Sequence, residues 1–555
     1  MSYIIIVLLG LRPFICEQAN ASLAILFDIF FLSFFLLYIL LIKNFQIKKP
    51  VFFLSLIFPF FIMLSNFFSV NSYNSEAELL RVFVLVLIFN FVYFQNKKQR
   101  NVLIAGMLSI SAIICLRALY QYFSGIDFIR NSQTFDQLTK NGFYAWELLL
   151  QKRVVSWFAS PNILGGYLIA FCPLACVYLF KSIGEKNKKA TVLFSFLCLA
   201  LFLSVLLTKT ISVFLSFILS MIFLFTLLSR GKKTGEMNKA AGIILTVFFV
   251  CLLGLFLKRG DSFFDFKNPQ NSFSQRVYYW QSGLKMISEH PVAGIGAGNF
   301  RTVYPRFKNA NANETIYTHN SYIQIWAESG FAALAFFLLF VFIVFRSALK
   351  RRPEPIDAGI IAGCFAVLLH NFTDYSLFVN QSGHIWWILL GCVLSGSEHD
   401  LKIIERSTRQ SLFLRMSYLI FSIFLLFNAF LFYQSERSIK ESVMFFKNRQ
   451  FNSSIISAYK ALRCKPNNDL AYYILARNFR VIEVGKLSPK ALNNYKQAIS
   501  LNKNYAFYYF ELAEYFFSHN KIDSARRFIR LAIKFYPQNS KFQALNSSIN
   551  KLKSK

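Results

Sequence analysis

Long apolar runs separated by short polar connections dominate the first 430 residues of the chain. A run of about 18 or more apolar residues can cross a hydrocarbon core as a helix. The hydropathic pattern predicts membrane spans near the following positions: 3–15, 23–42, 51–70, 79–94, 102–123, 162–180, 190–208, 210–229, 240–257, 330–345, 357–372, 384–396 and 412–433. We therefore expect an all-α fold, a polytopic bundle of 12 or 13 membrane helices over residues 1–433.

Lys and Arg residues gather in every second connection, whereas the short connections 17–22 and 71–78 contain neither. Positive residues near span ends are retained on the cytoplasmic side of a membrane. This alternation predicts that two long connections, 124–161 and 258–330, lie on the outer face. Connections of such length between spans commonly carry function.

Beyond residue 434 the pattern changes to amphipathic helices. Three segments recur at offsets of 37 and 34 residues: Lys460-Ala461-Leu462, Gln497-Ala498-Ile499 and Leu531-Ala532-Ile533. This period resembles tetratricopeptide repeats, in which paired helices stack, and predicts a helical repeat domain over 434–555. A generic helical hairpin bundle is the alternative. With 22 Lys+Arg against 7 Asp+Glu, the tail has a net charge of +15. That surface suits an acidic protein partner or anionic lipid, or is simply solvated.

Composition narrows the class of protein further. Of 555 residues, 55% are hydrophobic and 18% aromatic, which excludes a water-soluble globule. The formal charge of +33 is spread over short loops, so we expect no nucleic-acid partner. The nine cysteines lie mostly inside spans and show neither a disulfide framework nor zinc spacing. The sequence predicts no metal and no cofactor.

Elimination among the six histidines leaves one candidate for chemistry. The others fall in a cytoplasmic loop, a repeat turn, span ends or a helix C-terminus: His399, His519, His370, His384 and His290. His319 remains, in the outer connection just before an apolar span. A neutral imidazole accepts a proton near ambient pH, so His319 is a candidate general base. An inert loop histidine is the plainer interpretation.

The same connection holds two further features. Arg276 begins an amphipathic stretch, 276–289, that predicts a helix. A turn containing Gly294, Gly296 and Gly298 follows, and glycine permits close backbone approach or a positive φ. A simple tight connection is the alternative. No Gly-Lys-Ser/Thr follows, so the turn does not match a phosphate-binding loop.

Together these residues resemble the signature of the O-antigen ligase/polymerase superfamily. The motifs that carry the resemblance in the outer connection are Arg276-x3-Trp280, His290-Pro291, Gly294-x-Gly296-x-Gly298-x-Phe300, Tyr304, His319-Asn320 and Glu328-x-Gly330. Two secondary motifs are similar as well: Arg153…Phe158-x-x-Pro161-Asn162 and His370-Asn371-Phe372-x-Asp374. Tetratricopeptide tails also occur in this superfamily.

The resemblance implies metal-independent, inverting transfer of a glycan from an undecaprenyl-diphosphate carrier to an acceptor hydroxyl. Transfer takes place at the periplasmic face of the bacterial inner membrane, in the biosynthesis of lipopolysaccharide or another surface polysaccharide. It implies that His319 acts as base and that Arg276 and Arg153 hold the diphosphate, for which the guanidinium fork is suited. Lys209 stands where the family usually has a further Arg, without the fork geometry. Asn320, Glu328, Asp374, Asn162 and the three glycines would support the site.

The acceptor separates the subclasses of this superfamily. A ligase would use lipid A core or another lipid, a polymerase a growing glycan, and a protein O-oligosaccharyltransferase a protein; the large outer loop and repeat tail favour the ligase. From other classes, a lipid-linked glycan transporter or flippase and a non-catalytic scaffold remain. Arg81 and Arg117 are the only basic residues well inside the predicted spans and lack a paired acid, which disfavours a transporter. Expected partners are the lipid-linked donor, the acceptor, membrane lipids and a protein bound through the repeats.

Overall fold

The computed structural model describes residues 1–16, 21–41, 49–127, 151–229, 250, 254, 268–395, 408–483 and 487–551. Within these ranges all regular secondary structure is helical, which confirms the all-α fold. Seven described helices are long and apolar enough to cross a membrane, and three shorter ones are similarly apolar. The chain is therefore a multi-pass membrane protein. Apart from residues 250 and 254, the predicted span at 240–257 lies outside the described residues, as do parts of both long connections predicted for the outer face.

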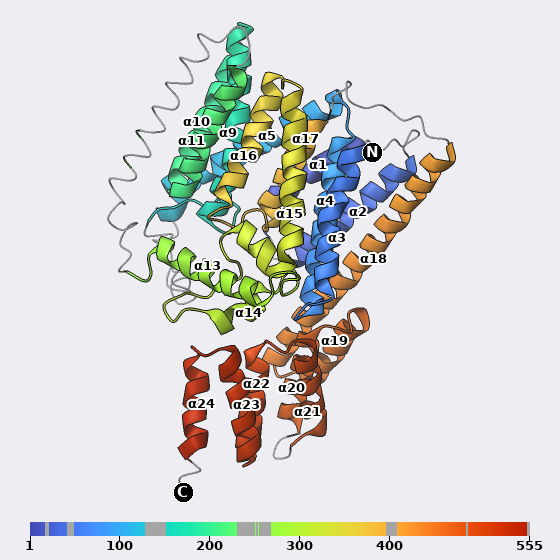
Figure 1. Cartoon of the computed structure of the whole chain (residues 1–555), viewed down its shortest axis with the longest axis vertical. Helices are drawn as coiled ribbons and strands as arrows, with labels where there is room; N and C mark the ends of the chain where they lie inside the picture. The colour runs from blue at the N-terminus through green and yellow to red at the C-terminus, as the bar shows by residue number, and fades with distance from the viewer. Residues whose placement is uncertain are drawn as a thin grey trace.

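The bundle helices follow the predicted spans closely (Figure 1). In chain order they are α1 (Ser2–Leu11), α2 (Ala21–Leu41), α3 (Lys49–Asn66), α4 (Ser72–Tyr93), α5 (Lys97–Tyr120), α9 (Pro161–Gly184), α10 (Lys188–Thr208), α11 (Ile211–Leu228), α15 (Ser321–Lys350), α16 (Pro355–His370), α17 (Asn380–Leu394) and α18 (Thr408–Lys447). Local chemistry fixes their ends. α9, for example, begins at Pro161 because the Ser160 side chain accepts a hydrogen bond from the Ile163 N–H.

Helix α15 begins nine residues before the predicted span at 330–345. Gly330 has non-helical torsion angles, φ 81° and ψ 172°, so a short helix from Ser321 meets the apolar membrane helix at a kink. A Cβ at Gly330 would lie 1.8 Å from the Val292 carbonyl oxygen, so only glycine allows this contact. The connection predicted for the outer face consequently ends at Asn320, and the first part of α15 lies at the same end of the bundle as that connection.

The centre of the bundle is formed by α4, α9, α16 and α17. Every residue of α17 is buried, and α9 is largely enclosed. Aromatic rings fill the space between α4, α15 and α17, where Trp387 packs against Phe89 and Phe340 with ring centroids 6.1 and 5.7 Å apart. At the periphery α10 exposes Leu193 and Phe196, as expected for a helix that faces lipid.

The two ends of the bundle differ in charge and in covering. At one end lie α13 (Ser272–Glu289), α14 (Phe300–Phe307) and the C-terminal tail (Figure 1). At the other end Arg100 pairs with Asp357 at 2.8 Å and Lys97 with Glu354 at 3.3 Å. The segments predicted for the outer face thus share one end, and two of the predicted basic loops meet at the opposite end.

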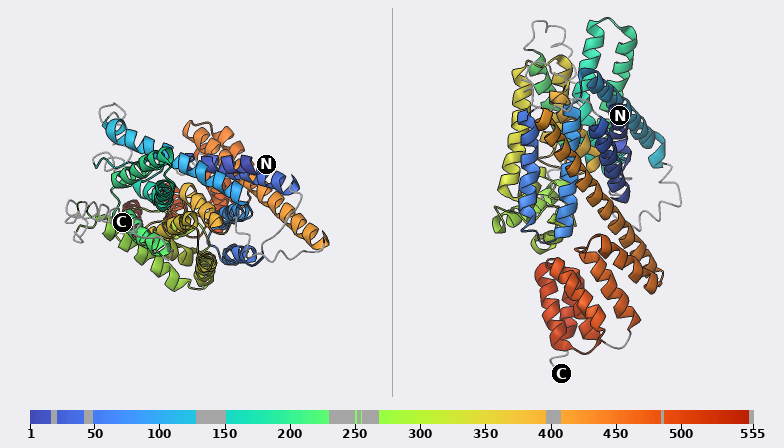
Figure 2. Two further views of the ribbon diagram at one scale, coloured as in Figure 1. Left: turned by 90° about the horizontal axis from the view of Figure 1, so that it is seen from above. Right: turned by 90° about the vertical axis from the view of Figure 1, so that its right-hand side faces the viewer.

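The tail is a stack of antiparallel helical hairpins (Figure 2). Its helices are α19 (Phe451–Cys464), α20 (Asp469–Ile482), α21 (Pro489–Leu501), α22 (Ala506–Ser518), α23 (Ile522–Phe535) and α24 (Ser540–Lys551). α18 is continuous through the predicted boundary at 433/434. The tail docks against the bundle through Lys465, which lies 3.1 Å from Glu76, and through Glu436, which accepts a hydrogen bond from Tyr73 at 2.7 Å.

Candidate functional site

The turn that leads into α15 carries His319 and is held by local hydrogen bonds. Asn320 caps the helix: its side-chain oxygen accepts from the backbone N–H groups of Tyr322 and Ile323, both at 3.0 Å. Thr318 Oγ1 donates to the Asn320 carbonyl oxygen at 2.6 Å. Between these two residues His319 has a left-handed backbone, with φ 54°. This conformation is uncommon for a residue other than glycine, so the surrounding hydrogen bonds must maintain it. The turn thereby fixes the direction of the imidazole.

Aromatic rings form two walls around the imidazole of His319. The Tyr279 ring stacks on it with centroids 5.2 Å apart, and the Tyr375 ring meets it edge-on at 4.6 Å. Neither ring nitrogen hydrogen-bonds to a residue that the structure describes, and Nδ1 is fully enclosed. The side chain as a whole is only partly covered. An imidazole with unused nitrogens and partial access is available to a ligand.

Two charged neighbours act on His319 in opposite directions. The pKa of His319 is lowered to about 4, first by burial and second by the positive charge of Arg276, while the carboxylate of Asp374 opposes the shift. The imidazole is consequently neutral at ambient pH. A neutral imidazole can accept a proton, which is the state required of a general base.

Arg276 lies on α13, one turn before Tyr279, so the helix presents both to the same neighbourhood. Its Nε donates to the Thr373 carbonyl oxygen at 2.9 Å, and its Nη1 donates to the Ser272 carbonyl oxygen at 3.1 Å. The side chain is half-buried. The structure therefore brings Arg276 to the connection between α16 and α17, next to the residues that flank His319.

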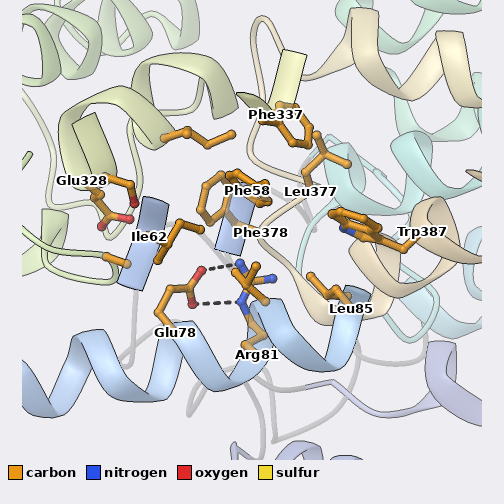
Figure 3. Close-up of a pocket in the computed structure, with 14 residues that line it drawn as sticks. Phe58, Ile62, Glu78, Arg81, Leu85, Glu328, Phe337, Leu377, Phe378 and Trp387 are labelled. Carbon is orange, nitrogen blue, oxygen red and sulfur yellow. Dashed lines mark hydrogen bonds and ion pairs between the residues drawn. The ribbon is translucent and has the colours of Figure 1, made fainter. Parts of the chain in front are cut away.

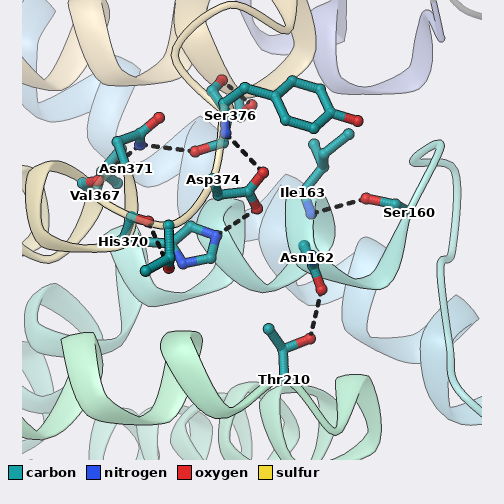
Figure 4. A network of polar contacts seen from close by, with 12 residues as sticks. Ser160, Asn162, Ile163, Thr210, Val367, His370, Asn371, Asp374 and Ser376 are labelled. Carbon is teal, nitrogen blue, oxygen red and sulfur yellow. Dashed lines mark hydrogen bonds and ion pairs between the residues drawn. The ribbon is translucent and has the colours of Figure 1, made fainter. Parts of the chain in front are cut away.

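That connection, residues 371–379, is a dense polar network (Figure 4). Asp374 Oδ2 lies 2.8 Å from His370 Nε2, with both side chains fully buried. Burial alone would raise the pKa of Asp374, but the adjacent His370 holds it below its usual range. Asn371 Oδ1 accepts from Ser321 Oγ at 2.6 Å, and Asn320 Nδ2 donates to the Phe372 carbonyl oxygen at 2.9 Å. The connection is thereby joined to the turn that holds His319.

A second polar cluster surrounds Arg153 at the tip of the α10–α11 hairpin. Arg153 Nε donates to the Thr208 carbonyl oxygen at 2.9 Å. Its Nη2 donates to Asn162 Oδ1 at 3.1 Å and to Thr210 Oγ1 at 3.0 Å. The guanidinium thus joins three segments: the irregular segment before α9, the first turn of α9 and the tip of the α10–α11 hairpin.

Lys209 lies at this tip, between the two threonines that bind Arg153. It ends α10 with a left-handed backbone, φ 51°, and its Nζ donates to the Gln151 carbonyl oxygen at 2.5 Å. The ammonium group is therefore directed at the chain just before Arg153. Arg153 provides the fork-shaped guanidinium of this cluster, and Lys209 adds a second positive charge beside it.

The first two turns of α9 connect the Arg153 cluster with the 371–379 connection (Figure 4). A Cβ added at Gly166 would lie 2.9 Å from His370 Cδ2 and 3.2 Å from Ser376 Oγ, so the helix and the connection are in close contact. Asn162 lies one turn earlier on the same helix. Asp374 and its partner His370 therefore stand between the Arg153 cluster and the Arg276–His319 pair, and all lie at one end of the bundle.

The glycine-rich turn has the positive φ angles and close backbone approach that its composition allows. Gly294, Gly296 and Gly298 all have positive φ. A Cβ at Gly294 would lie 2.4 Å from the Glu328 carbonyl oxygen, and one at Gly296 would lie 2.4 Å from Ser69 Oγ. Glu328 itself accepts a hydrogen bond from the Phe300 N–H at 2.8 Å. These residues clamp the outer connection onto α15 and the α3–α4 connection.

A small apolar cavity lies inside the bundle beside this clamp (Figure 3). Its volume is about 40 Å³, and its walls include Phe58, Phe337 and Trp387. Glu78 and Arg81 form an ion pair at its edge, with Arg81 Nε 2.9 Å from Glu78 Oε2. The cavity therefore has room for about one water molecule and is polar on one side. Because Glu78 lies one turn before Arg81 on α4 and pairs with it, the expectation that Arg81 lacks a paired acid is wrong.

Several residues of this site were not found from the sequence. Tyr279 and Tyr375 flank His319, and Thr210 completes the Arg153 cluster. His370 was assigned a structural role at a span end, yet it pairs with Asp374. Two signals pointed to that pair: the spacing of four residues between His370 and Asp374 at a helix end, and the motif His370-Asn371-Phe372-x-Asp374 that contains both.

Comparison with known protein families gives a match to part of the chain. A family model described as O-antigen ligase matches residues 196–338. The matched segment contains Lys209, Arg276, the glycine-rich turn, His319 and Glu328, but not Arg153, Asn162, Asp374 or the tail. No curated protein matches the chain. The match supports the O-antigen ligase superfamily, and with it a membrane glycosyltransferase-like enzyme that carries out ligase-like or polymerase-like transfer.

Proposed function

We propose that the chain transfers a glycan from an undecaprenyl-diphosphate carrier to an acceptor hydroxyl at the periplasmic face of the bacterial inner membrane, as an O-antigen ligase-like enzyme. The observation that carries this proposal is the imidazole of His319. It is neutral and partly accessible, it uses neither nitrogen in a hydrogen bond to the described residues, and it lies near Arg276 at the covered end of the bundle.

In the proposed reaction the acceptor oxygen attacks the anomeric carbon of the donor sugar. The new oxygen–carbon bond forms as the bond from that carbon to the diphosphate oxygen breaks, and the diphosphate leaves with the electron pair. His319 takes the proton of the attacking hydroxyl. Attack from the face opposite the leaving group inverts the anomeric configuration. His319 is the catalytic residue of this scheme.

The guanidinium groups of Arg276 and Arg153 bind the diphosphate in this proposal. Fixed positive charge stabilises the negative charge that develops on the leaving oxygen, and the planar fork of arginine matches phosphate oxygens. Lys209 adds charge at the Arg153 cluster. Asn162, Asn320 and Asp374 position these groups, while Glu328 and the glycine-rich turn hold the outer connection in place. The reaction needs no metal ion.

In this proposal, donor binding also changes the pKa of the base, His319. Arg276 contributes to the low pKa of His319. A diphosphate on Arg276 would neutralise that charge, so the pKa of His319 would rise towards its ordinary value when the donor is bound. The imidazole thereby becomes a stronger base only in the complex that is ready to react.

A transfer assay in lipid tests the proposal. Purified protein is given a lipid-diphosphate glycan and a panel of lipid, glycan and peptide acceptors, with and without a chelator. His319→Ala is compared with wild type, and His290→Ala serves as a matched control because His290 is an exposed histidine of the same outer connection. Product that resists the chelator and is lost only in His319→Ala supports the proposal.

The acceptor that gains sugar distinguishes a ligase from a repeat-unit polymerase or a protein O-oligosaccharyltransferase. Equal product from His319→Ala and wild type would exclude His319 as the base. Absence of product with every acceptor would favour the transporter or flippase alternative, which translocation of a labelled lipid-linked glycan would then test.

A further inference from the structure

A groove in the C-terminal tail lies outside the site described above. It has a volume of about 580 Å³ and is formed where α18 ends, α19 begins and α20 passes behind them. Its lining residues are Val443, Phe446, Lys447, Arg449, Phe451, Ile474, Arg477 and Val481. This volume is in the range of sites that bind small ligands or short peptide segments.

The floor of the groove is apolar and ordered. Phe446 and Phe451 meet edge-to-face with centroids 5.8 Å apart, and Ile474 is almost completely buried beneath them. The Arg477 guanidinium covers the Phe446 ring at 4.7 Å. At the rim Val481 is 39% exposed. An aromatic or aliphatic side chain of a partner would therefore find a preformed apolar surface here.

The rim of the groove is positively charged. Lys447 and Arg449 are both exposed, and neither forms an ion pair with a carboxylate within the described ranges. Arg449 has a left-handed backbone, φ 60°, at a helix C-terminus, where glycine is the usual residue. Arg477 lies 3.6 Å from Glu511, so its charge is partly compensated. Two uncompensated cations beside an apolar floor suit an acidic segment that also carries an apolar side chain.

The position of the groove argues against membrane lipid as the occupant. Arg415 donates to the backbone at the end of α2, at the Ile39 carbonyl oxygen, and the charged residues of α18 resume at Glu436. From Glu436 to Lys447 the helix advances about 17 Å, at about 1.5 Å per residue. The head-group layer on each side of a bilayer is about 5 to 8 Å thick, so the groove lies beyond it even though α18 is tilted (Figure 1), and a protein on the same side of the membrane can reach it.

We propose that this groove binds an acidic peptide segment of a partner protein, with Lys447 and Arg449 contacting its carboxylates and the Phe446–Phe451 floor accepting an aromatic or aliphatic side chain. The tail thus recruits a protein to the enzyme. This function is separate from glycosyl transfer and does not depend on the identity of the donor or acceptor.

Fluorescence anisotropy with the full chain in phosphatidylcholine nanodiscs tests the proposal. The probe is a fluorescein-labelled peptide, Gly-Asp-Glu-Phe-Asp-Glu-Leu-Gly. One control peptide replaces each acid by its amide, and another replaces Phe and Leu by Ser. We expect the probe to bind about tenfold or more tightly than either control, because both the charges and the apolar side chain are used.

A matched pair of double variants separates groove binding from general attraction to a basic tail. Lys447→Gln with Arg449→Gln removes two charges from the groove, and Lys496→Gln with Arg530→Gln removes two exposed charges elsewhere on the tail. The first is expected to weaken probe binding about tenfold or more and the second by less than about threefold. Circular dichroism and glycosyl transfer are expected to be unchanged in both.

Three results would overturn the proposal. Equal weakening by the two double variants would show attraction to net charge alone. Equal binding of the probe and both control peptides would show that the groove does not select an acidic, apolar segment. Failure of the probe to bind, together with capture of phosphatidylglycerol vesicles that is lost in Lys447→Gln/Arg449→Gln, would identify lipid as the occupant.

Discussion

Two histidines of this protein lie close to an acid and an arginine, and their surroundings differ in one respect that matters for chemistry. His384, on α17, is completely buried: its Nδ1 is 2.8 Å from the Asn380 carbonyl oxygen and its Nε2 is 3.5 Å from Asp28 Oδ1. Arg12 is also completely buried near this pair, over the Phe27 ring. His319 has aromatic walls and partial exposure, and its nitrogens make no hydrogen bond to the described residues.

The difference suggests a general criterion. Proximity of a histidine, an acid and an arginine does not by itself indicate a reaction, because buried charged groups need partners for stability alone. A histidine that is completely buried inside the bundle, with one nitrogen bonded to the backbone and the other facing a buried acid, has no atom that a substrate can reach. A histidine whose backbone is held firmly and whose nitrogens make no hydrogen bond has a nitrogen available to a substrate. The following predictions test this contrast, beginning with the largest expected effect.

Removing the imidazole of His319 should have the largest effect. His319→Ala is expected to reduce transfer by about 10²- to 10⁴-fold, the usual contribution of a general base, with no change in membrane insertion. Transfer of labelled glycan per folded protein measures the effect. A loss below about tenfold would contradict the assignment of His319 as base.

Arg276→Gln should reduce transfer by about 10²-fold, because a charge-assisted contact to the diphosphate is lost. It should also change the pH dependence. Transfer requires neutral His319, so kcat/KM of wild type decreases as the pH falls through about 4. Without the Arg276 charge the pKa of His319 rises, and the acid limb moves to higher pH, still below the ordinary value because burial remains. If the acid limb of the pH profile stayed at the wild-type position, the proposed effect of Arg276 on the pKa of His319 would be contradicted.

Asp374→Asn should have a smaller effect of opposite sign on the pH profile. The carboxylate raises the pKa of His319, so its removal lowers that pKa further and weakens the base. We expect kcat to decrease about threefold to tenfold and the acid limb to move to lower pH. Asn preserves the shape of the side chain, so a shift in the profile distinguishes this role from simple loss of structure.

His384→Leu should have the smallest effect on catalysis. It leaves Asp28 and the Asn380 carbonyl oxygen without the imidazole as a buried polar neighbour, so the unfolding temperature should decrease, by a loss of about 1 to 3 kcal/mol in stability. Transfer per folded protein should stay within about twofold of wild type. The measurements are thermal unfolding in nanodiscs and the same transfer assay. Normal stability with a large loss of transfer would place His384 in the reaction and remove the contrast with His319.

The fold was largely predictable because each membrane helix is a local feature of the sequence. Apolar runs gave the spans, and the amphipathic stretch from Arg276 gave α13. The beginning of α15 was not found, since hydropathy marks the apolar part after Gly330 and is silent on the polar turn of helix that Asn320 caps. The kink depends on the close contact between Gly330 and the Val292 carbonyl oxygen, which is distant from the kink in sequence.

The site was predictable only in part, for a related reason. His319 was found by elimination among six histidines and Arg276 by its place in the same connection. Tyr375 and Thr210 were not found, because their roles depend on packing between helices that are distant in the chain. The resemblance to a family supplied motifs but not the neighbours that those motifs acquire on folding.

Helix α18 has a consequence beyond joining the tail to the bundle. It is one continuous helix of 40 residues, and the contacts Lys465–Glu76 and Tyr536–Glu314 fasten the tail to the rest of the chain at two further points. Such a helix conveys rotation as well as distance, since each residue turns the chain by about 100°. One residue inserted after Tyr433 would turn the whole tail and carry the groove to another side of the molecule. The register of α18 therefore fixes the rotation of the tail relative to the bundle. It determines the direction from which a protein bound in the groove would face the outer connection.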